Sequence, residues 1–309
     1  PYTTLFRSMA RGVKLDTTEI ERARARLIGL VAETDVQDIS PNLTLKLENN
    51  QHSGSFKARG AMNALLCSAV GPDGVLAASG GNHGAAVAWA SQRLGYESNI
   101  FVPSIISSTK LKRLESYGAN VHIAGSEYQE TFEAAEEFGR EHQCVEIHAY
   151  DQHEVIAGAG TLAMEVDRQL SEFSTVVVAC GGGGLSGGLA TWWGAKKRIV
   201  VVETKGTATF ANSLAMGKLT DVEVSGVAAD SLGARRLGHL GWNALRSVNA
   251  ESSVVSDADV LAAQSALLHE FDVVAEPAAA AGYAAIRSGR LKITDGERCL
   301  LIVCGGNSE

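Results

Sequence analysis

The sequence is poor in proline, in basic runs and in long apolar segments. Only 5 of the 309 residues are proline, and no low-complexity linker divides the chain. The formal net charge is −8 without any basic run, which argues against a nucleic acid or an anionic membrane surface as partner. No apolar stretch reaches the ~20 residues that a bilayer-spanning helix needs. The sequence therefore predicts a globular chain whose partner is a small molecule.

Cysteine pairs and metal-binding spacings are also missing. The cysteines number 5, which is odd, and none of them forms a C-x-x-C pair. The 8 histidines show no H-E-x-x-H spacing. Free thiols in odd number fit a reducing cytoplasm better than a secreted disulfide framework. The five positions are Cys67, Cys144, Cys180, Cys299 and Cys304.

The first eight residues, PYTTLFRS, precede Met9. They lack the basic start and the apolar core of a signal peptide. We interpret them as foreign to the natural sequence, with Met9 as its first residue.

Short strand-like segments alternate with helical patterns along most of the chain. Residues 43–48 (LTLKLE) alternate apolar and polar side chains, and residues 299–303 (CLLIV) are continuously apolar, so both predict strands. Strands that alternate with helices form parallel sheets covered by helices. The sequence therefore predicts an α/β fold, although residues 205–250 give no clear pattern.

Glycine is abundant, at 33 residues, and it clusters after predicted strands. The segment ACGGGGLSGG, residues 179–188, follows a β-branched strand and opens a helix. Backbone N–H groups of such a loop, next to a helix N-terminus, favour a phosphate group. Gly182, Gly184 and Gly187 also satisfy G-x-G-x-x-G, and Glu203 ends the next strand, so an NAD-dependent dehydrogenase is an alternative.

Two further glycine loops and one lysine count against that alternative. SGGNHG (79–84) and CGGN (304–307) also follow apolar strands, and three such loops would converge on one cleft. Lys57 begins a helical pattern, where the helix dipole and partial burial favour a neutral, nucleophilic amine. Pyridoxal phosphate needs a lysine for its Schiff base, an anion cradle and groups around its ring. This cofactor accounts for the lysine and the loops together.

Several motifs then resemble one enzyme family. SGSFKARGA around Lys57 is similar to the cofactor-lysine motif of fold-type II pyridoxal phosphate enzymes, in their threonine/serine dehydratase and serine racemase branch. The asparagine loop, the tetraglycine loop, AGAGTLAMEV (157–166), EPAAAAGYAA (276–285) and the terminal VCGGN resemble that branch in the same order. The resemblance implies a tryptophan synthase β-like fold of two domains with mostly parallel sheets flanked by helices. Residues 9–73 and 148–309 would form the large cofactor-binding domain, and residues 74–147 the small one.

The resemblance also implies residue roles. Lys57 would hold the cofactor and act as general base, Phe56 would flank the ring, Asn82 would bond its 3′ oxygen, and Cys304 would face its nitrogen. The backbone of one loop would bind the phosphate: Gly181, Gly182, Gly183, Gly184 and Leu185. Another loop would bind the substrate carboxylate: Ser79, Gly80, Gly81, Asn82 and His83. Phe56, His83 and Cys304 also have purely structural interpretations, as a core aromatic, a helix cap and a small buried residue.

The sequence departs from this branch at two places. Racemases have a second serine where Gly80 stands, so racemase activity should be weak. Glu203 matches a glutamate that binds a divalent cation in the racemase-like members, but the partner aspartate falls near Thr209. One carboxylate is a poor cation site. We therefore interpret Glu203 as a hydrogen-bonded strand-end residue and keep Glu203 and Glu276 only as weak cation candidates.

The resemblance implies a cytoplasmic, homodimeric ammonia-lyase that converts L-threonine or L-serine to a 2-oxo acid and ammonia. Hydroxyaspartate, phenylserine or serine racemisation are alternatives, because residues 227–242, which complete the substrate pocket in this family, do not reveal a side-chain preference. No regulatory domain follows CGGNSE, so we expect no feedback control by an amino acid.

Overall fold

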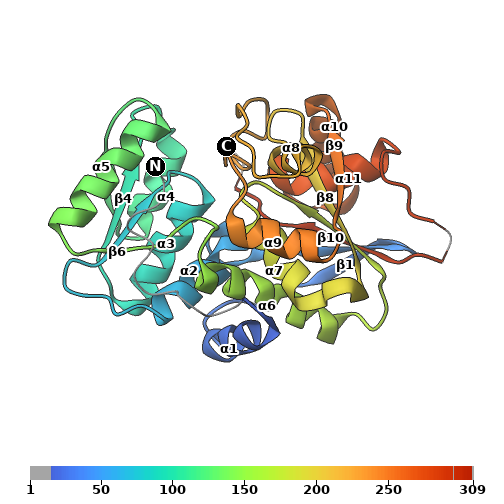
Figure 1. Cartoon of the computed structure of the whole chain (residues 1–309), viewed down its shortest axis with the longest axis horizontal. Helices are drawn as coiled ribbons and strands as arrows, with labels where there is room; N and C mark the ends of the chain where they lie inside the picture. Colours follow the sequence, from blue (N-terminus) through green and yellow to red (C-terminus); the bar gives the residue numbers. More distant parts are fainter. Residues whose placement is uncertain (1–14, 295, 308–309) are drawn as a thin grey trace.

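The computed structural model describes residues 15–294 and 296–307. The interpretation of residues 1–8 therefore lies outside the described residues. The described strands form a larger and a smaller sheet, which lie side by side (Figure 1). None of the helices formed by the described residues has the length and apolar character that a bilayer crossing requires.

The larger sheet has six strands in the order β1-β2-β10-β7-β8-β9. All its pairings are parallel except that of β1 with β2. Its central strands are apolar and fully buried, as expected for strands covered on both faces. The strands are β1 (Val36–Ser40), β2 (Leu43–Leu47), β7 (Thr175–Ala179), β8 (Arg198–Thr204), β9 (Glu251–Val255) and β10 (Cys299–Val303).

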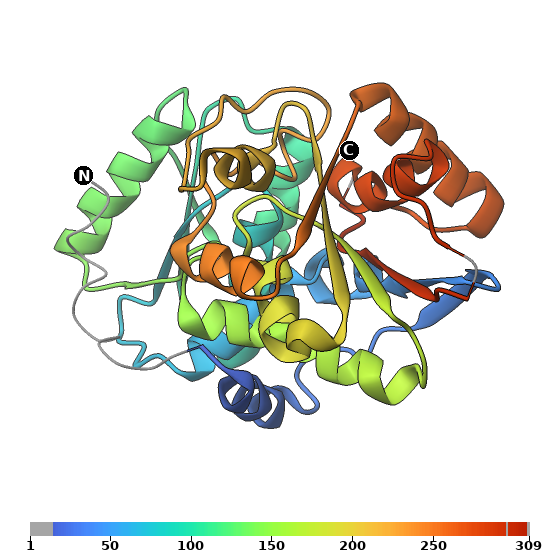
Figure 2. The same cartoon turned by 45° about the vertical axis from the view of Figure 1, so that its right-hand side comes forward.

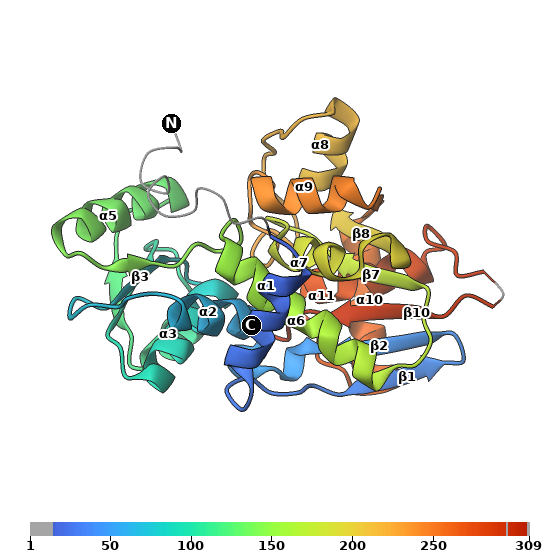
Figure 3. The same ribbon diagram turned by 60° about the horizontal axis from the view of Figure 1, so that its bottom comes forward.

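Helices cover this sheet. They are α1 (Thr17–Leu27), α2 (Lys57–Leu66), α6 (His153–Gln169), α7 (Gly184–Trp193), α8 (Thr209–Met216), α9 (His239–Ser247), α10 (Asp257–Phe271) and α11 (Pro277–Arg287). Helix α11 packs on β7, β8, β9 and β10. A Cβ at Gly282 would lie 2.3 Å from Leu301 Cδ1, so this glycine permits the close approach of helix and sheet. Helices α6 and α7 pack on each other, and α1 lies across α6 (Figure 3).

The smaller sheet has four parallel strands in the order β5-β4-β3-β6. They are β3 (Val75–Ala78), β4 (Ser98–Val102), β5 (Asn120–Ile123) and β6 (Val145–Glu146), and their helices are α3 (Asn82–Leu94), α4 (Ser108–Ser116) and α5 (Tyr128–Glu141). Helix α5 lies at one side of the molecule, opposite α10 and α11 (Figure 2). Short 3-10 turns complete the described structure: η1 (Glu48–Asn50), η2 (His52–Gly54) and η3 (Gly194–Lys196).

The predicted fold class is confirmed: the chain is α/β with mostly parallel sheets. The strands predicted at 43–48 and 299–303 are β2 and β10. The segment 205–250, which gave no clear pattern, contains α8 and α9. Because parallel strands end at the same sheet edge, the loops after β3, β7 and β10 are the ones to examine for a site.

Candidate active site

Lys57 is the first residue of α2 and is only partly exposed. Its Nζ donates a hydrogen bond to the Ala149 carbonyl oxygen at 2.6 Å and lies 5.2 Å from the centre of the Phe56 ring. Desolvation lowers the pKa of Lys57 to about 8, although the nearby Cys304 and Glu276 act in the opposite direction. A neutral amine is therefore accessible at this position near neutral pH.

The end of β10 fixes the start of α2. The Phe56 N–H donates to the Cys304 carbonyl oxygen at 3.0 Å, and Ser55 forms an isolated bridge with Gly305. The Cys304 side chain is buried, and burial raises its pKa, so the thiol stays neutral. The structure thus brings Phe56, Lys57 and Cys304 together across almost the whole length of the sequence.

The tetraglycine loop connects β7 to α7. Gly183 has φ +85°, and α7 begins at Gly184. A Cβ at Gly182 would lie 2.2 Å from Tyr150 Cγ, so only glycine fits against this ring. Tyr150 follows Ala149 directly, which places the loop next to the residue that holds Lys57 Nζ.

The donors of this loop fit a phosphate group. Within the described residues, the N–H groups of Gly181 and Gly182 have no hydrogen-bond acceptor. Leu185 follows in the first turn of α7, whose N-terminus carries a partial positive charge. Free N–H groups at a helix start provide the donor set that a phosphate monoester requires.

The asparagine loop has a similar build. It follows β3, and α3 begins at Asn82. The Gly81 N–H donates to Ser79 Oγ at 3.3 Å. A Cβ at Gly84 would lie 1.8 Å from the Ser79 carbonyl oxygen, which explains why the loop needs this glycine. A Cβ at Gly80 would lie 2.9 Å from Ile106 Cδ1, so that position points at an apolar side chain.

Asn82 is held from two sides. Its Nδ2 lies 2.8 Å from both carboxyl oxygens of Glu276, and its Oδ1 accepts a hydrogen bond from Asn307 Nδ2 at 2.7 Å. Asn307 also donates to the Ser53 carbonyl oxygen at 2.7 Å. Burial raises the pKa of Glu276 to about 7. This cluster joins the loops after β3 and β10, and its Asn307 ends the VCGGN motif, which was the available signal for it.

His83 makes a structural contact. Its Nε2 lies 2.8 Å from the Ile147 carbonyl oxygen, and burial lowers its pKa to about 3. The ring is therefore neutral and ties α3 to the segment after β6. Its part in substrate binding stays a prediction.

Glu203 and Glu276 each have protein partners instead of further acidic ligands. Glu203 accepts hydrogen bonds from the backbone N–H groups of Phe210 and Ala211 at 2.7 and 2.9 Å, as a strand-end residue that caps a helix. Among the described residues, no group of three or more His, Cys, Asp or Glu side chains is arranged to hold a metal ion.

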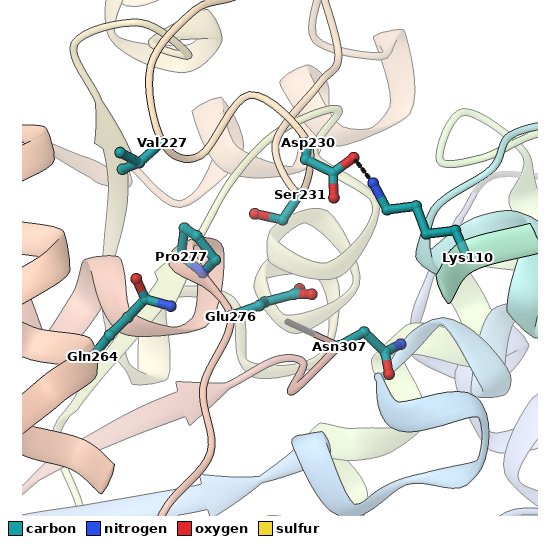
Figure 4. A pocket seen from close by; sticks show the side chains of 8 residues that line it. All are labelled: Lys110, Val227, Asp230, Ser231, Gln264, Glu276, Pro277 and Asn307. Atoms are coloured by element: carbon teal, nitrogen blue, oxygen red, sulfur yellow. Dashed lines mark hydrogen bonds and ion pairs between the residues drawn. The ribbon is translucent and has the colours of Figure 1, made fainter. Parts of the chain in front are cut away.

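A cavity of about 290 Å³ adjoins the Asn82–Glu276–Asn307 cluster (Figure 4). Its lining residues come from both sheets and their helices: Lys110, Val227, Asp230, Ser231, Gln264, Glu276, Pro277 and Asn307. Lys110 Nζ lies 2.6 Å from Asp230 Oδ1, and this ion pair joins α4 to the segment between α8 and α9. The sequence did not indicate Lys110, because its partner is 120 residues away.

A family model described as pyridoxal-phosphate dependent enzyme matches residues 27–305. The chain belongs to this family. Pyridoxal 5′-phosphate is therefore its cofactor, as the lysine and the loops predicted. The dehydrogenase alternative built on Gly182, Gly184, Gly187 and Glu203 is set aside by this membership, and Gly187 instead packs inside α7 against Gly241.

Individual relatives narrow the branch within the family. The chain is 32% identical to an L-threonine ammonia-lyase of Thermotoga maritima over 268 residues, which cover 85% of this chain and 66% of that protein. It is 31% identical to a catabolic L-threonine dehydratase of Staphylococcus aureus over 304 residues, covering 94% and 88%. A serine racemase structure from maize superposes with a TM-score of 0.89 at 28% identity, covering 96% and 95%.

A bacterial-type threonine deaminase structure superposes with a TM-score of 0.86 at 30% identity, covering 95% of this chain and 99% of that chain. The predicted membership in the threonine/serine dehydratase and serine racemase branch of the fold-type II enzymes is thus confirmed.

Proposed function

We propose that the chain is an ammonia-lyase that dehydrates L-threonine or L-serine to a 2-oxo acid and ammonia. One observation carries the proposal: a lysine amine with a lowered pKa lies where the three glycine loops meet. The names of its relatives among threonine ammonia-lyases and dehydratases support the same reaction.

The chemistry divides between cofactor and chain. Bound pyridoxal phosphate supplies an electron sink that acidifies the Cα–H bond of an attached amino acid. Lys57 Nζ takes that proton as general base, after which the Cβ–O bond breaks and the hydroxyl leaves as water. The enamine that leaves the site is hydrolysed in water to the 2-oxo acid and ammonia.

The loops bind and orient. The N–H groups from Gly181 to Leu185 would hold the phosphate, and the start of α3, with Ser79, Gly80, Gly81 and His83, would hold the substrate carboxylate. Asn82 would be kept in place by Glu276 and Asn307 as it bonds the ring oxygen. Phe56 would flank the ring.

The neutral thiol of Cys304 would face the ring nitrogen. A thiol whose pKa is raised by burial does not supply the negative charge that keeps a pyridine nitrogen protonated. Weaker electron withdrawal stores the carbanion charge less deeply. This arrangement favours prompt loss of the β-hydroxyl over slower competing reactions.

The cavity of about 290 Å³ bears on the alternative substrates. Its ionisable side chains are Lys110, Asp230 and Glu276, with Lys110 already paired to Asp230. An acidic β-substituent such as that of hydroxyaspartate would meet an excess of negative charge. The cavity therefore favours neutral β-hydroxy amino acids.

Serine racemisation is the second candidate, because a serine racemase is among the similar structures. Racemisation needs an acid on the face of Cα opposite Lys57. Gly80, where racemases have a serine, has no side chain for this purpose. We therefore propose that elimination greatly exceeds racemisation.

We further propose a small domain of residues 74–147 between the two parts of a large domain, 9–73 and 148–309. The strands of the smaller sheet all fall inside the first range. We propose a homodimer by analogy with the family, and a cytoplasmic location because the five cysteines are free thiols in the structure.

The experiment is a product assay on purified protein loaded with pyridoxal phosphate. With L-serine, we expect pyruvate to exceed D-serine by at least about tenfold, measured by a coupled pyruvate assay and chiral chromatography. Lys57→Ala should lose turnover and the visible absorption that borohydride abolishes in the natural chain. Lys197→Ala, which alters a lysine beside Phe173, serves as control. Comparable amounts of D-serine and pyruvate would contradict the proposal.

A further inference from the structure

Glu203 and Thr209 form a buried contact beneath the tetraglycine loop. Both side chains are fully buried. Glu203 ends β8, and its carboxyl oxygens face the first turn of α8, where the Phe210 and Ala211 N–H groups donate to them. The start of α8 therefore supplies the partial positive charge that a carboxyl group in this place needs.

Thr209 links this carboxyl group to the loop. Its Oγ1 lies 2.6 Å from the Gly181 carbonyl oxygen and 3.0 Å from Glu203 Oε1. The position is also the one at which the sequence resemblance expects an aspartate for a divalent cation. A hydroxyl group that bonds the loop directly stands where that second acidic ligand would be.

The Gly181 carbonyl group matters because of peptide planarity. The Gly181 C=O and the Gly182 N–H belong to one planar peptide unit and point in opposite directions. When Thr209 holds the carbonyl oxygen on the α8 side, the Gly182 N–H points away from α8, and it has no acceptor within the described residues. One hydroxyl group thus sets the direction of a free donor in the loop.

The proton count along this contact is satisfied. Thr209 has one hydroxyl proton and two neighbouring oxygens. Burial raises the pKa of Glu203 to about 7, so its neutral form is accessible. In that form Glu203 donates to Thr209 Oγ1, and Thr209 donates to the Gly181 carbonyl oxygen.

We propose that Thr209 is a positioning residue for cofactor binding: together with Glu203 and the start of α8 it braces the phosphate loop, so that the loop needs no divalent cation. This inference rests on the proposed assignment of residues 181–185 to the cofactor phosphate. It concerns cofactor affinity and not the identity of the substrate.

The test measures the dissociation constant of pyridoxal phosphate from the apoprotein by equilibrium dialysis. Thr209→Val keeps the shape and removes the hydroxyl group, and we expect affinity to fall about tenfold, since a buried carbonyl group loses its donor. Thr209→Ser keeps the donor and should stay within about twofold of the natural chain. Thr191→Val is the matched control, because it removes a hydroxyl–carbonyl bond inside α7, to Gly187, at 2.8 Å.

Unchanged affinity in Thr209→Val would overturn the inference. A second measurement uses the natural chain and so does not depend on the folding of a variant. EDTA should leave its affinity for the cofactor unchanged. A loss of affinity in EDTA that magnesium restores would overturn the inference. A chain that lacks lyase activity but shows the expected Thr209 effect would contradict only the proposed reaction.

Discussion

Lys57 lies at a helix start, where a cation is poorly stabilised. Its backbone is fixed there by β10 through the Phe56 N–H and the Cys304 carbonyl group. Desolvation lowers its pKa to about 8, while the nearby Glu276 and Cys304 limit the shift. The same amine on the surface would be almost entirely protonated at neutral pH.

The lowered pKa predicts how the apoprotein captures its cofactor. The cation predominates below pH 8 and the nucleophilic amine above it, so the rate constant of capture should rise with pH and level off above about 8 to 9. Stopped-flow absorption over this range measures the rate. Free Nα-acetyl-lysine is the control and should react ever faster up to about pH 10.4. The same continued rise in the protein would show that the pKa of Lys57 is normal.

Helix α2 is anchored by buried charges. Arg59, two residues after Lys57, bonds Glu48 of η1 at 2.7 and 2.8 Å and Glu165 of α6 at 2.9 Å. Lys46 of β2 lies 2.5 Å from Glu165 and is fully buried. Two cations and two anions balance inside the core, so removing one of them leaves an uncompensated charge.

Arg59→Ala should therefore lower the free energy of unfolding by about 3 to 5 kcal/mol. Urea denaturation monitored by circular dichroism measures the change. Arg168→Ala is the control, because its partner Glu33 is exposed and such pairs contribute about 0 to 1 kcal/mol. Equal effects of the two substitutions would contradict the buried-network explanation.

The two sheets meet around the cavity, and Lys110 and Asp230 join them across its opening (Figure 4). Asp230 is 60% exposed, so salt screens this pair and its contribution to stability is small. The pair holds α4 against the segment between α8 and α9 without locking it. A contact of this strength suits an opening that substrate must pass.

Asp230→Asn should raise KM for the amino acid by about two- to fivefold and leave kcat nearly unchanged. It should also reduce the dependence of KM on ionic strength. Steady-state assays at low and high salt measure both effects. The control is Asp221→Asn, which removes an ion pair with Arg236 that stays within one segment. An unchanged KM and salt dependence in Asp230→Asn would show that the pair does not influence substrate entry.

The elements that were hardest to read lie at sheet edges or depend on distant partners. Strands β1 and β9 are the two edges of the larger sheet, and their sequences VQDIS and ESSVV carry little apolar signal. An edge strand is paired on one side only and needs fewer buried side chains. Central strands such as β7 and β10 are covered on both faces, so their apolar runs were readable.

The sequence alone determined the α/β fold, the glycine loops after the strands and the helix start that carries Lys57. These features depend on local properties: glycine conformations, apolar runs and the dipole of a helix. Only the tertiary structure decided the partners of side chains. Glu276 holds Asn82 across 194 positions, and Thr209 reaches back 28 residues to Gly181. Such contacts leave no local pattern, because which residues meet is set by how the sheets and helices pack.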